Sequence, residues 1–199
     1  MLTVNGDRGV VERQLSGGEL VCPSCGGVLG GWGHGVERGV RVLGGPAVRV
    51  CPRRSRCRSC GGTHVLLPVW CLLRRADAAA VIGAALVAAA AGGGFRVIAR
   101  MLGRPGETVR GWLRRFAGRA EEVRVFFTVL LAATAPDPVM PAGAGSVIAA
   151  AVSAVAGAAA AAGERWPLLG QVPVWAAASA ASGGRLLAPG WPGGGCNAS

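Results

Sequence analysis

Apolar residues recur at helical spacing on both sides of a short polar stretch near the middle of the chain. The first run covers residues 95–102 and the second covers residues 109–116. Between them, Gly103 suits the left-handed turn that ends a helix, and Pro105 prevents the first helix from continuing. We therefore expect two short helices joined by a tight turn. Their buried faces are expected to be formed by Val97, Ile98, Met101 and Leu102, and by Val109, Trp112, Leu113 and Phe116.

An alanine-rich segment before this pair also has helical spacing. Residues 76–91 are mostly alanine and are followed by three glycines, which end a helix. The apolar side chains expected to face the core are Val81, Ile82, Leu86 and Val87. Two helices alone enclose no core, so we predict that residues 76–118 form one trihelical unit.

The C-terminal third is predicted to be helical as well. We expect a helix over residues 121–134, a second over 146–162, and a third over 168–181 that Pro173 interrupts. The glycine- and proline-rich residues 183–199 are predicted to form an irregular tail. In the first of these helices, the expected buried residues are Val125, Phe126, Val129 and Leu130.

Two cysteine motifs share one form, Cys22-Pro-Ser-Cys25-Gly-Gly and Cys57-Arg-Ser-Cys60-Gly-Gly. In each motif a turn brings two thiolates to one side, and the glycines let backbone amides point at the sulfurs. Four thiolates make the closed tetrahedral shell of a structural zinc site, which leaves no vacancy for catalysis. We therefore predict that Cys22, Cys25, Cys57 and Cys60 bind structural Zn²⁺.

The other cysteines and both histidines are weaker candidates. Cys51 lies between the two motifs and is an alternative ligand, as are His34 and His64. Cys71 is expected in the core, and Cys196 is expected to be free in the tail. Charges are scattered through the first twenty residues, a pattern that does not fit a signal peptide. We therefore expect the reducing cytoplasm, where cysteines favour metal ligation over disulfides.

The net charge of +11 comes from arginine alone, because the chain contains no lysine. Residues 1–75 carry eleven arginines against four acidic residues, and residues 76–120 carry seven against two. Residues 121–199 carry three arginines against four acidic residues. This distribution indicates a polyanionic partner for the first two segments and not for the third.

The two central helices have the pattern of a helix-turn-helix motif, with a small residue at Ala99, a turn glycine and apolar positions after it. In that motif the second helix enters the major groove of DNA. Groups suited to phosphates and base edges remain on its polar side. They are Arg104, Thr108, Arg110, Arg114 and Arg115. The alternative interpretation is a plain helical hairpin whose arginines face water.

A second arginine-rich segment lies just before and within the second cysteine motif. Arg53, Arg54 and Arg56 belong to it and are candidates for phosphate contacts. The alternative is that these charges protect the edge of a strand. Strands are expected over residues 36–43, 47–50 and 63–69, with a Gly-Gly-Pro turn between the first two.

The predicted fold class is therefore α+β. It consists of a small β zinc ribbon, a trihelical helix-turn-helix unit and an alanine-rich helical C-terminal region. In chain order, the expected parts are an N-terminal arm at residues 1–19, the zinc ribbon at 20–70, the helix-turn-helix DNA-binding unit at 71–118, the alanine-rich helical region at 119–182 and the irregular tail at 183–199.

The segments CPSCGG, WGH, RCRSCGGTHVLLP and IARMLGRPGETVRGWLRRF resemble a family of small actinobacterial helix-turn-helix proteins of unassigned function. The heads of those proteins are similar to the N-terminal heads of insertion-sequence transposases. The resemblance covers residues 20–118 and extends more loosely to residues 184–189. It implies a zinc-ribbon DNA-binding protein in which the four motif cysteines are the ligands.

Three functions remain open on the sequence alone. The first is a non-catalytic binder of double-stranded DNA, either a transcriptional regulator or an accessory or remnant of a transposase, located in the cytoplasm on the nucleoid. The second is a protein-interaction or membrane-associated module in which the ribbon docks a protein partner. The third is a transposase or recombinase. Against the third, residues 121–199 contain only four acids, and none follows a strand pattern that would gather them around metal ions.

Residues 138–163 contain no charged side chain, which raises the question of a membrane span. Alanine is nearly neutral for membrane insertion, and few arginines flank the segment. We therefore expect alanine-rich helices that pack on each other, or on a second copy as a homodimer, in preference to a membrane span.

Overall fold

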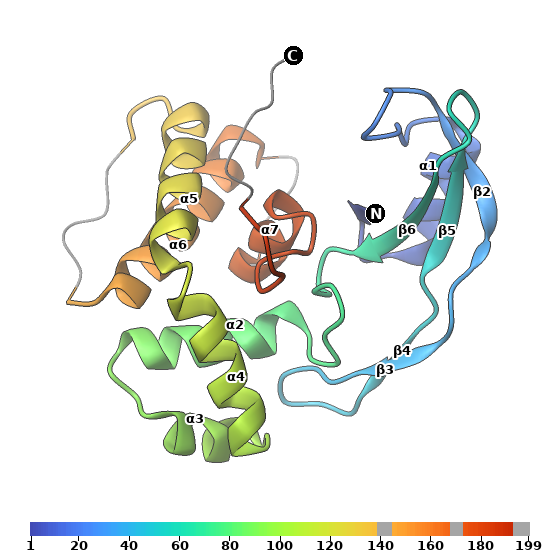
Figure 1. The fold of residues 1–199 in the computed structure, drawn as a ribbon. Coiled ribbons are helices and arrows are strands. Elements are labelled where there is room, and N and C mark those ends of the chain that lie inside the picture. Colours follow the sequence, from blue (N-terminus) through green and yellow to red (C-terminus); the bar gives the residue numbers. More distant parts are fainter. Residues whose placement is uncertain (139–144, 168–172, 193–199) are drawn as a thin grey trace.

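The computed structural model describes residues 1–138, 145–167 and 173–192. Within these ranges the chain is mixed α and β, as expected, with seven helices and a small sheet (Figure 1). The predicted helix at residues 168–181 is described only from Pro173 onward, and Cys196 lies outside the described residues. The sheet and α1 lie on one side of the molecule, and the other six helices lie on the opposite side.

The sheet contains four strands in the order β1-β6-β5-β2. β1 (Leu2–Val4) pairs parallel with β6 (Thr63–Pro68), and the other neighbours are antiparallel. β5 (Arg53–Cys57) is the other inner strand, and β2 (Leu29–His34) forms the second edge of the sheet. A separate hairpin consists of β3 (Arg38–Val40) and β4 (Val48–Val50). Both hairpin strands lie within the two valine-rich segments that the sequence predicts, but β3 is shorter than expected.

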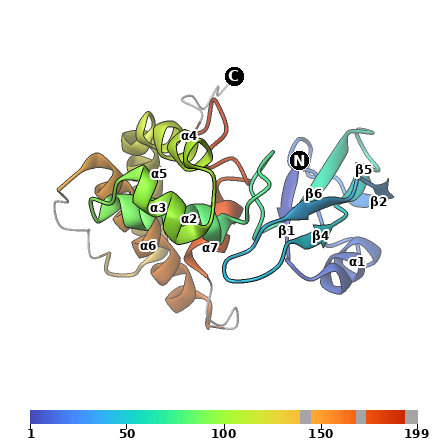
Figure 2. The same ribbon diagram turned by 90° about the horizontal axis from the view of Figure 1, so that it is seen from below.

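The first nineteen residues are part of the ribbon and do not form a separate arm. β1 occupies an edge of the sheet, and α1 (Arg8–Ser16) covers one face of it (Figure 2). Val11 and Leu15 of α1 reach a small core beneath the strands, together with Leu29 and Leu66. The pairing of β1 with β6 joins residues more than sixty positions apart, so no local pattern reveals it.

Three short helices follow, in the region predicted to be trihelical. They are α2 (Ala79–Ala90), α3 (Phe95–Leu102) and α4 (Gly106–Ala117), and each packs against the other two. Gly103 has φ of 61° and ends α3 in the left-handed conformation, as the sequence predicts. Val109, Trp112 and Phe116 of α4 are buried, which confirms three of the four positions expected there.

The buried face of α3 differs from the expected one. Ile98 and Ala99 are buried, whereas Val97 and Met101 are exposed. The helix packs through Phe95, Ile98, Ala99 and Leu102, which have the i, i+3, i+4, i+7 spacing of a single face. The prediction was correct for Ile98 and Leu102 and wrong for Val97 and Met101, because the small Ala99 lies at the centre of the buried face, where α3 approaches α2 and α4. Val87 of α2 is exposed as well.

The C-terminal helices are α5 (Ala120–Thr134), α6 (Val147–Arg165) and α7 (Val174–Ala181). α5 packs along α6 through Val123, Phe127 and Leu131. Val125 and Val129, which were expected to be buried, are exposed. The apolar positions of α5 extend around more than one face, so only the partner helix decides which of them is covered.

Residues 183–192 lack regular structure but are not a peripheral tail. Leu186, Leu187 and Trp191 are buried in the main core, and the Trp191 ring contacts those of Phe126 and Phe127 edge to face. The segment thereby closes the end of the helical region against α5.

Among the described residues, α6 is the one helix long and apolar enough to cross a membrane, judged by length and composition alone. Core helices of soluble proteins often meet the same criterion. α6 packs against α2, α5 and α7, an arrangement compatible with a soluble protein.

Candidate metal centre and nucleic-acid interface

The two cysteine motifs fold into nearly identical turns. In the first, the N–H of Gly26 donates to the Cys22 carbonyl at 2.8 Å, and Gly26 has φ of 71°. In the second, the N–H of Gly61 donates to the Cys57 carbonyl at 3.1 Å, and Gly61 also has φ of 71°. Glycine is required at these two positions because residues with a Cβ rarely adopt this conformation.

The turns bring four sulfurs from distant parts of the chain together. The Sγ atoms of Cys25 and Cys57 are 3.5 Å apart, and those of Cys22 and Cys60 are 3.8 Å apart. All four lie within 4.8 Å of one another. A tetrahedral zinc with Zn–S bonds of about 2.3 Å separates its sulfurs by about 3.8 Å. The four cysteines therefore form a possible metal site with dimensions that suit zinc.

The electrostatics of the cluster favour a cation. A backbone hydrogen bond at Ser24 lowers the pKa of Cys22 to about 7, and one at Cys60 lowers the pKa of Cys57 to about 6. At Cys25, a backbone hydrogen bond from Gly27 also lowers the pKa, but the neighbouring thiols Cys57 and Cys60 outweigh it and raise the value to about 12. Some thiols thus ionise readily, and the accumulated negative charge then opposes further ionisation. A divalent metal ion among the sulfurs removes that repulsion.

The weaker ligand candidates lie outside the group of four. The buried ring of His64 places Nε2 3.3 Å from the Cys22 sulfur, so it contacts a ligand and is not one of the four clustered groups. The Cys51 thiol donates to the Gly35 carbonyl at 3.3 Å, and the exposed His34 contacts Arg8. Burial raises the pKa of Cys71 to about 11, in keeping with the core position expected for it.

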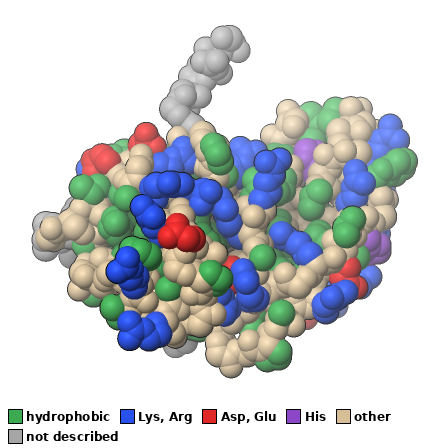
Figure 3. Space-filling model, turned by 60° about the horizontal axis from the view of Figure 1, so that its bottom comes forward, with side chains coloured by type: hydrophobic (Ala, Val, Ile, Leu, Met, Phe, Trp, Pro, Cys, Tyr) green, Lys and Arg blue, Asp and Glu red, His purple; other side chains and the backbone are tan. Residues whose placement is uncertain are grey.

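α4 presents a basic face to solvent, opposite its buried stripe. Arg110, Arg114 and Arg115 are exposed on it, and Thr108 is half-buried. Arg110 lies over the Phe95 ring of α3, 5.9 Å from its centre, and its guanidinium is 3.5 Å from the Glu107 carboxylate. Figure 3 shows arginine side chains gathered around a carboxylate on the side of the molecule that carries α3 and α4.

Arg104 does not belong to this exposed face. Its side chain is 15% exposed, and its Nε donates to the Asp77 carboxylate at 2.7 Å. Arg41, which follows β3, reaches the other oxygen of Asp77 at 2.6 Å. Asp77 therefore connects the turn between α3 and α4 with the ribbon, and Arg104 has a structural partner already.

The ribbon arginines are also divided. Arg53 contacts Glu12 of α1 at 2.9 Å and donates to the Gly33 carbonyl, so it faces the covered side of the sheet. Arg54 and Arg56 are exposed on the other side. Trp32 of β2 lies next to Arg56 on this exposed side. The sequence pattern indicated Arg56 as a candidate but not Trp32. The available signal was the alternation of Arg54 and Arg56 with the buried Ser55, which assigns the arginines to one face.

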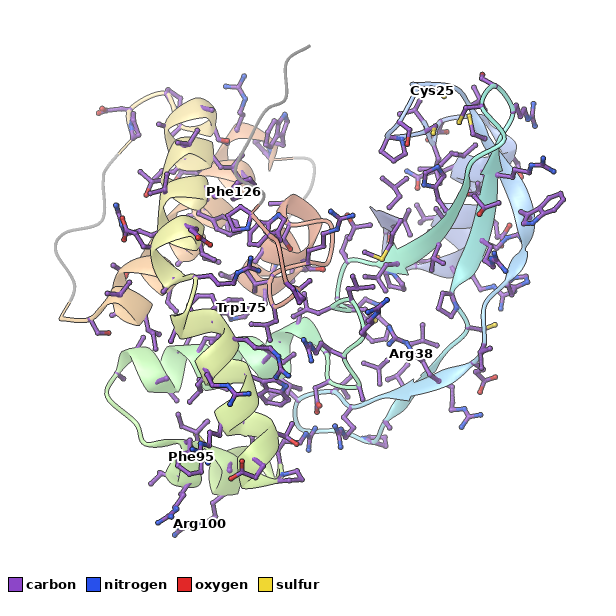
Figure 4. All side chains as sticks on the ribbon, viewed as in Figure 1. Cys25, Arg38, Phe95, Arg100, Phe126 and Trp175 are labelled. Atoms are coloured by element: carbon purple, nitrogen blue, oxygen red, sulfur yellow. The ribbon has the colours of Figure 1, made fainter. Side chains whose placement is uncertain are left out.

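The metal site lies far from the face of α3 and α4. Phe95 and Arg100 mark α3, and Cys25 lies at the end of the sheet that is furthest from them (Figure 4). A metal in the cysteine cluster would therefore fix the ribbon without touching a molecule bound at α4. Comparisons with protein-family profiles, with characterised proteins and with solved structures find no match for the chain.

Proposed function

We propose that the chain is a zinc-stabilised, non-catalytic protein that binds double-stranded DNA through α4. The observation that carries this proposal is the exposed trio Arg110, Arg114 and Arg115 on a helix whose opposite side is anchored by Val109, Trp112 and Phe116. A helix held in this way has one face free for a partner, and that face is basic.

The size of α4 fits a major groove. Its twelve residues span about 18 Å, and a groove about 12 Å wide admits one helix. Arg110 and Arg114 are one turn apart on the exposed side, which suits contacts to phosphates or guanine edges. The Arg115 side chain lies over Gly111 and donates to its carbonyl at 3.1 Å, so it lies beside the other two arginines on this face.

The ribbon is the second part of the proposed interface. Arg54 and Arg56 are exposed and available to phosphates, whereas Arg53 and Arg104 are held by Glu12 and Asp77. We therefore restrict the proposed DNA contacts to Thr108, Arg110, Arg114, Arg115, Arg54 and Arg56.

The proposed role of the metal is structural. Four thiolates fill a tetrahedral zinc shell and leave no position for water or substrate. For the helical region, Glu121 of α5 is paired with Arg124 and Glu122 with Arg119. Among the described residues, no trio of carboxylates is close enough to share a metal ion, and this favours binding over DNA cleavage.

The test is duplex binding by the zinc-loaded protein, measured by fluorescence anisotropy across a range of salt concentrations with random-sequence competitor. We expect a steep salt dependence, with log affinity falling by about 0.9 per log unit of salt for each phosphate contact. Arg110→Ala and Arg114→Ala should each weaken binding about 5- to 150-fold if they read bases, and less if they contact only phosphates.

Arg165→Ala is the matched control, because it removes one exposed positive charge at the end of α6, away from α4. Its affinity for duplex DNA should equal that of the wild type. Equal affinities for all three variants and the wild type would disprove the assignment of α4 as the recognition helix. Absence of duplex binding at low salt would instead favour the hypothesis that the ribbon docks a protein partner.

A further inference from the structure

One face of the sheet is open to solvent. Ser55 of β5 is buried on the side that α1 covers, so its neighbours Arg54 and Arg56 point to the opposite side. The register places Val65 of β6 beside Arg54 and Thr63 beside Arg56, and both are exposed. Figure 2 shows α1 on one side of the strands and none of the other helices against the opposite face.

An aromatic ring and two guanidinium groups share this open face. Trp32 is 52% exposed, and the guanidinium carbon of Arg56 lies 4.8 Å from the centre of its ring. The Nε of Arg58 is 3.5 Å from the position that a Cβ would take at Gly30, so the Arg58 side chain extends over that glycine. A half-exposed tryptophan beside two guanidinium groups offers a ligand both an aromatic face and positive charge.

A hollow of about 650 Å³ lies beside the ring. Gly30, Gly31 and Gly61 line it, and the absence of side chains at Gly30 and Gly61 leaves room for the Arg58 and Arg56 side chains that lie over them. Among the described residues that line the hollow, none is acidic, while Arg56 and Arg58 are both basic. The surface therefore combines an open space, a positive potential and one aromatic face.

We propose that this surface, formed by Trp32, Arg54, Arg56 and Arg58 and called here the Trp32 platform, binds unpaired bases of single-stranded nucleic acid. A base stacks on the indole, and the arginines neutralise the adjacent phosphates. A duplex offers only base edges and phosphates, because its base faces are already stacked. An apolar peptide would cover the ring but leave the guanidinium groups without a counter-charge. This inference does not depend on DNA binding by α4, although Arg54 and Arg56 belong both to the platform and to the proposed duplex contacts.

The experiment is fluorescence anisotropy with a labelled oligothymidylate of about 12 nucleotides, a length within the range of known single-strand sites. The zinc-loaded full chain should bind it, and Trp32→Ala should weaken binding about fivefold or more. Trp32→Phe should retain most of the affinity, because phenylalanine keeps an aromatic face. Arg56→Ala should weaken binding and reduce the salt dependence by about 0.7 for the lost contact.

Trp166 provides a matched control in the helical region. It is 48% exposed, and the guanidinium carbon of Arg165 lies 5.6 Å from the centre of its ring. Trp166→Ala and Arg165→Ala should therefore leave oligothymidylate affinity unchanged. Bound metal, measured for each variant, verifies that the ribbon is folded. Equal losses for Trp32→Ala and Trp166→Ala in folded protein would overturn the proposal.

The same titrations separate this inference from the proposed function. Loss of duplex binding in Arg110→Ala, with single-strand binding unchanged, would show that the Trp32 platform binds single strands without α4. Duplex binding without single-strand binding in the wild type would overturn the Trp32 platform alone. Single-strand binding without duplex binding would overturn the role of α4 alone. Single-strand binding that does not respond to Trp32→Ala would place the site elsewhere and overturn the platform.

Discussion

Asp77 is the acidic side chain at the junction of the ribbon and the helices. It is 3% exposed and is held by Arg41 from the ribbon and Arg104 from the turn before α4. Backbone hydrogen bonds reinforce the junction. The N–H of Arg41 donates to the Ala76 carbonyl, and the N–H of Ala78 donates to the Arg41 carbonyl. A complete buried ion group of this kind adds little net stability, but removing one partner strongly destabilises the fold, because it leaves a buried charge unpaired. The Asp77 carboxylate is therefore one of the contacts that hold α4 in its orientation relative to the ribbon.

Asp77→Asn should lower the free energy of unfolding by about 3 kcal/mol, because it leaves Arg104 buried without a counter-charge. The matched control is Glu37→Gln, which breaks the exposed pair with Arg49 and should cost at most about 1 kcal/mol. Urea denaturation of both variants gives the comparison. Similar losses in the two variants would show that the junction is no more important than a surface ion pair.

At the scale of elements, close approach of helices decides how the helical region packs. α7 lies against α2 at Gly83, where a Cβ would overlap the indole ring of Trp175. Gly157 of α6 similarly faces Leu131 of α5, because a Cβ added at Gly157 would lie 3.3 Å from a methyl carbon of Leu131. Glycine is costly inside a helix, so its presence at Gly83 is explained by the space that the neighbouring ring needs.

Gly83→Ala should destabilise the protein by about 1–3 kcal/mol, because Trp175 must move out of a packed position. Gly163→Ala is the control within α6: nothing lies within 4 Å of its Cβ position, so the change should stabilise the protein by about 1 kcal/mol. Thermal unfolding of both variants measures the difference. A stabilising effect at both positions would contradict the packing of α7 on α2.

At the scale of the whole molecule, the two cores have different supports. The small core beneath the sheet includes Cys22 and Cys57, so the possible metal site and the apolar contacts belong to the same part of the fold. The larger core extends from the β3–β4 hairpin through α2 to α5, α6 and the C-terminal segment. The larger core has many buried apolar side chains, whereas the smaller one has seven buried residues, so we expect the ribbon to depend on the metal for stability. A homodimer through the C-terminal helices stays a prediction.

Removal of the metal by a chelator should therefore unfold the ribbon and leave most of the helical signal in circular dichroism, because metal binding in small ribbons is folding free energy. Cys57→Ser should have the same effect and lose bound zinc. Cys51→Ser is the control: it lies outside the cluster and should keep one zinc per chain. Zinc lost from Cys51→Ser, or retained in full by Cys57→Ser, would refute the assigned ligand set.

Features that depend on neighbours in sequence were predictable. The cysteine motifs, the glycine turn between α3 and α4, and the buried stripe of α4 follow from spacing within a few residues, because turns and helices are local structures. The sequence also identified the four cysteines that cluster, since two matching motifs imply one shared site. Helix existence was predicted correctly in each alanine-rich segment that the structure describes.

Only the tertiary structure decided which side chains are free to act. Arg104 and Arg53 look like their neighbours in sequence, yet Asp77 and Glu12 hold them, and these partners come from other elements. The exposed position of Trp32 depends on which face of the sheet α1 covers, and the burial of Trp191 depends on its contact with α5. Each of these outcomes comes from contacts between residues far apart in the chain. Local spacing determines a helix or a turn, but the burial of a side chain depends on the element that packs against it.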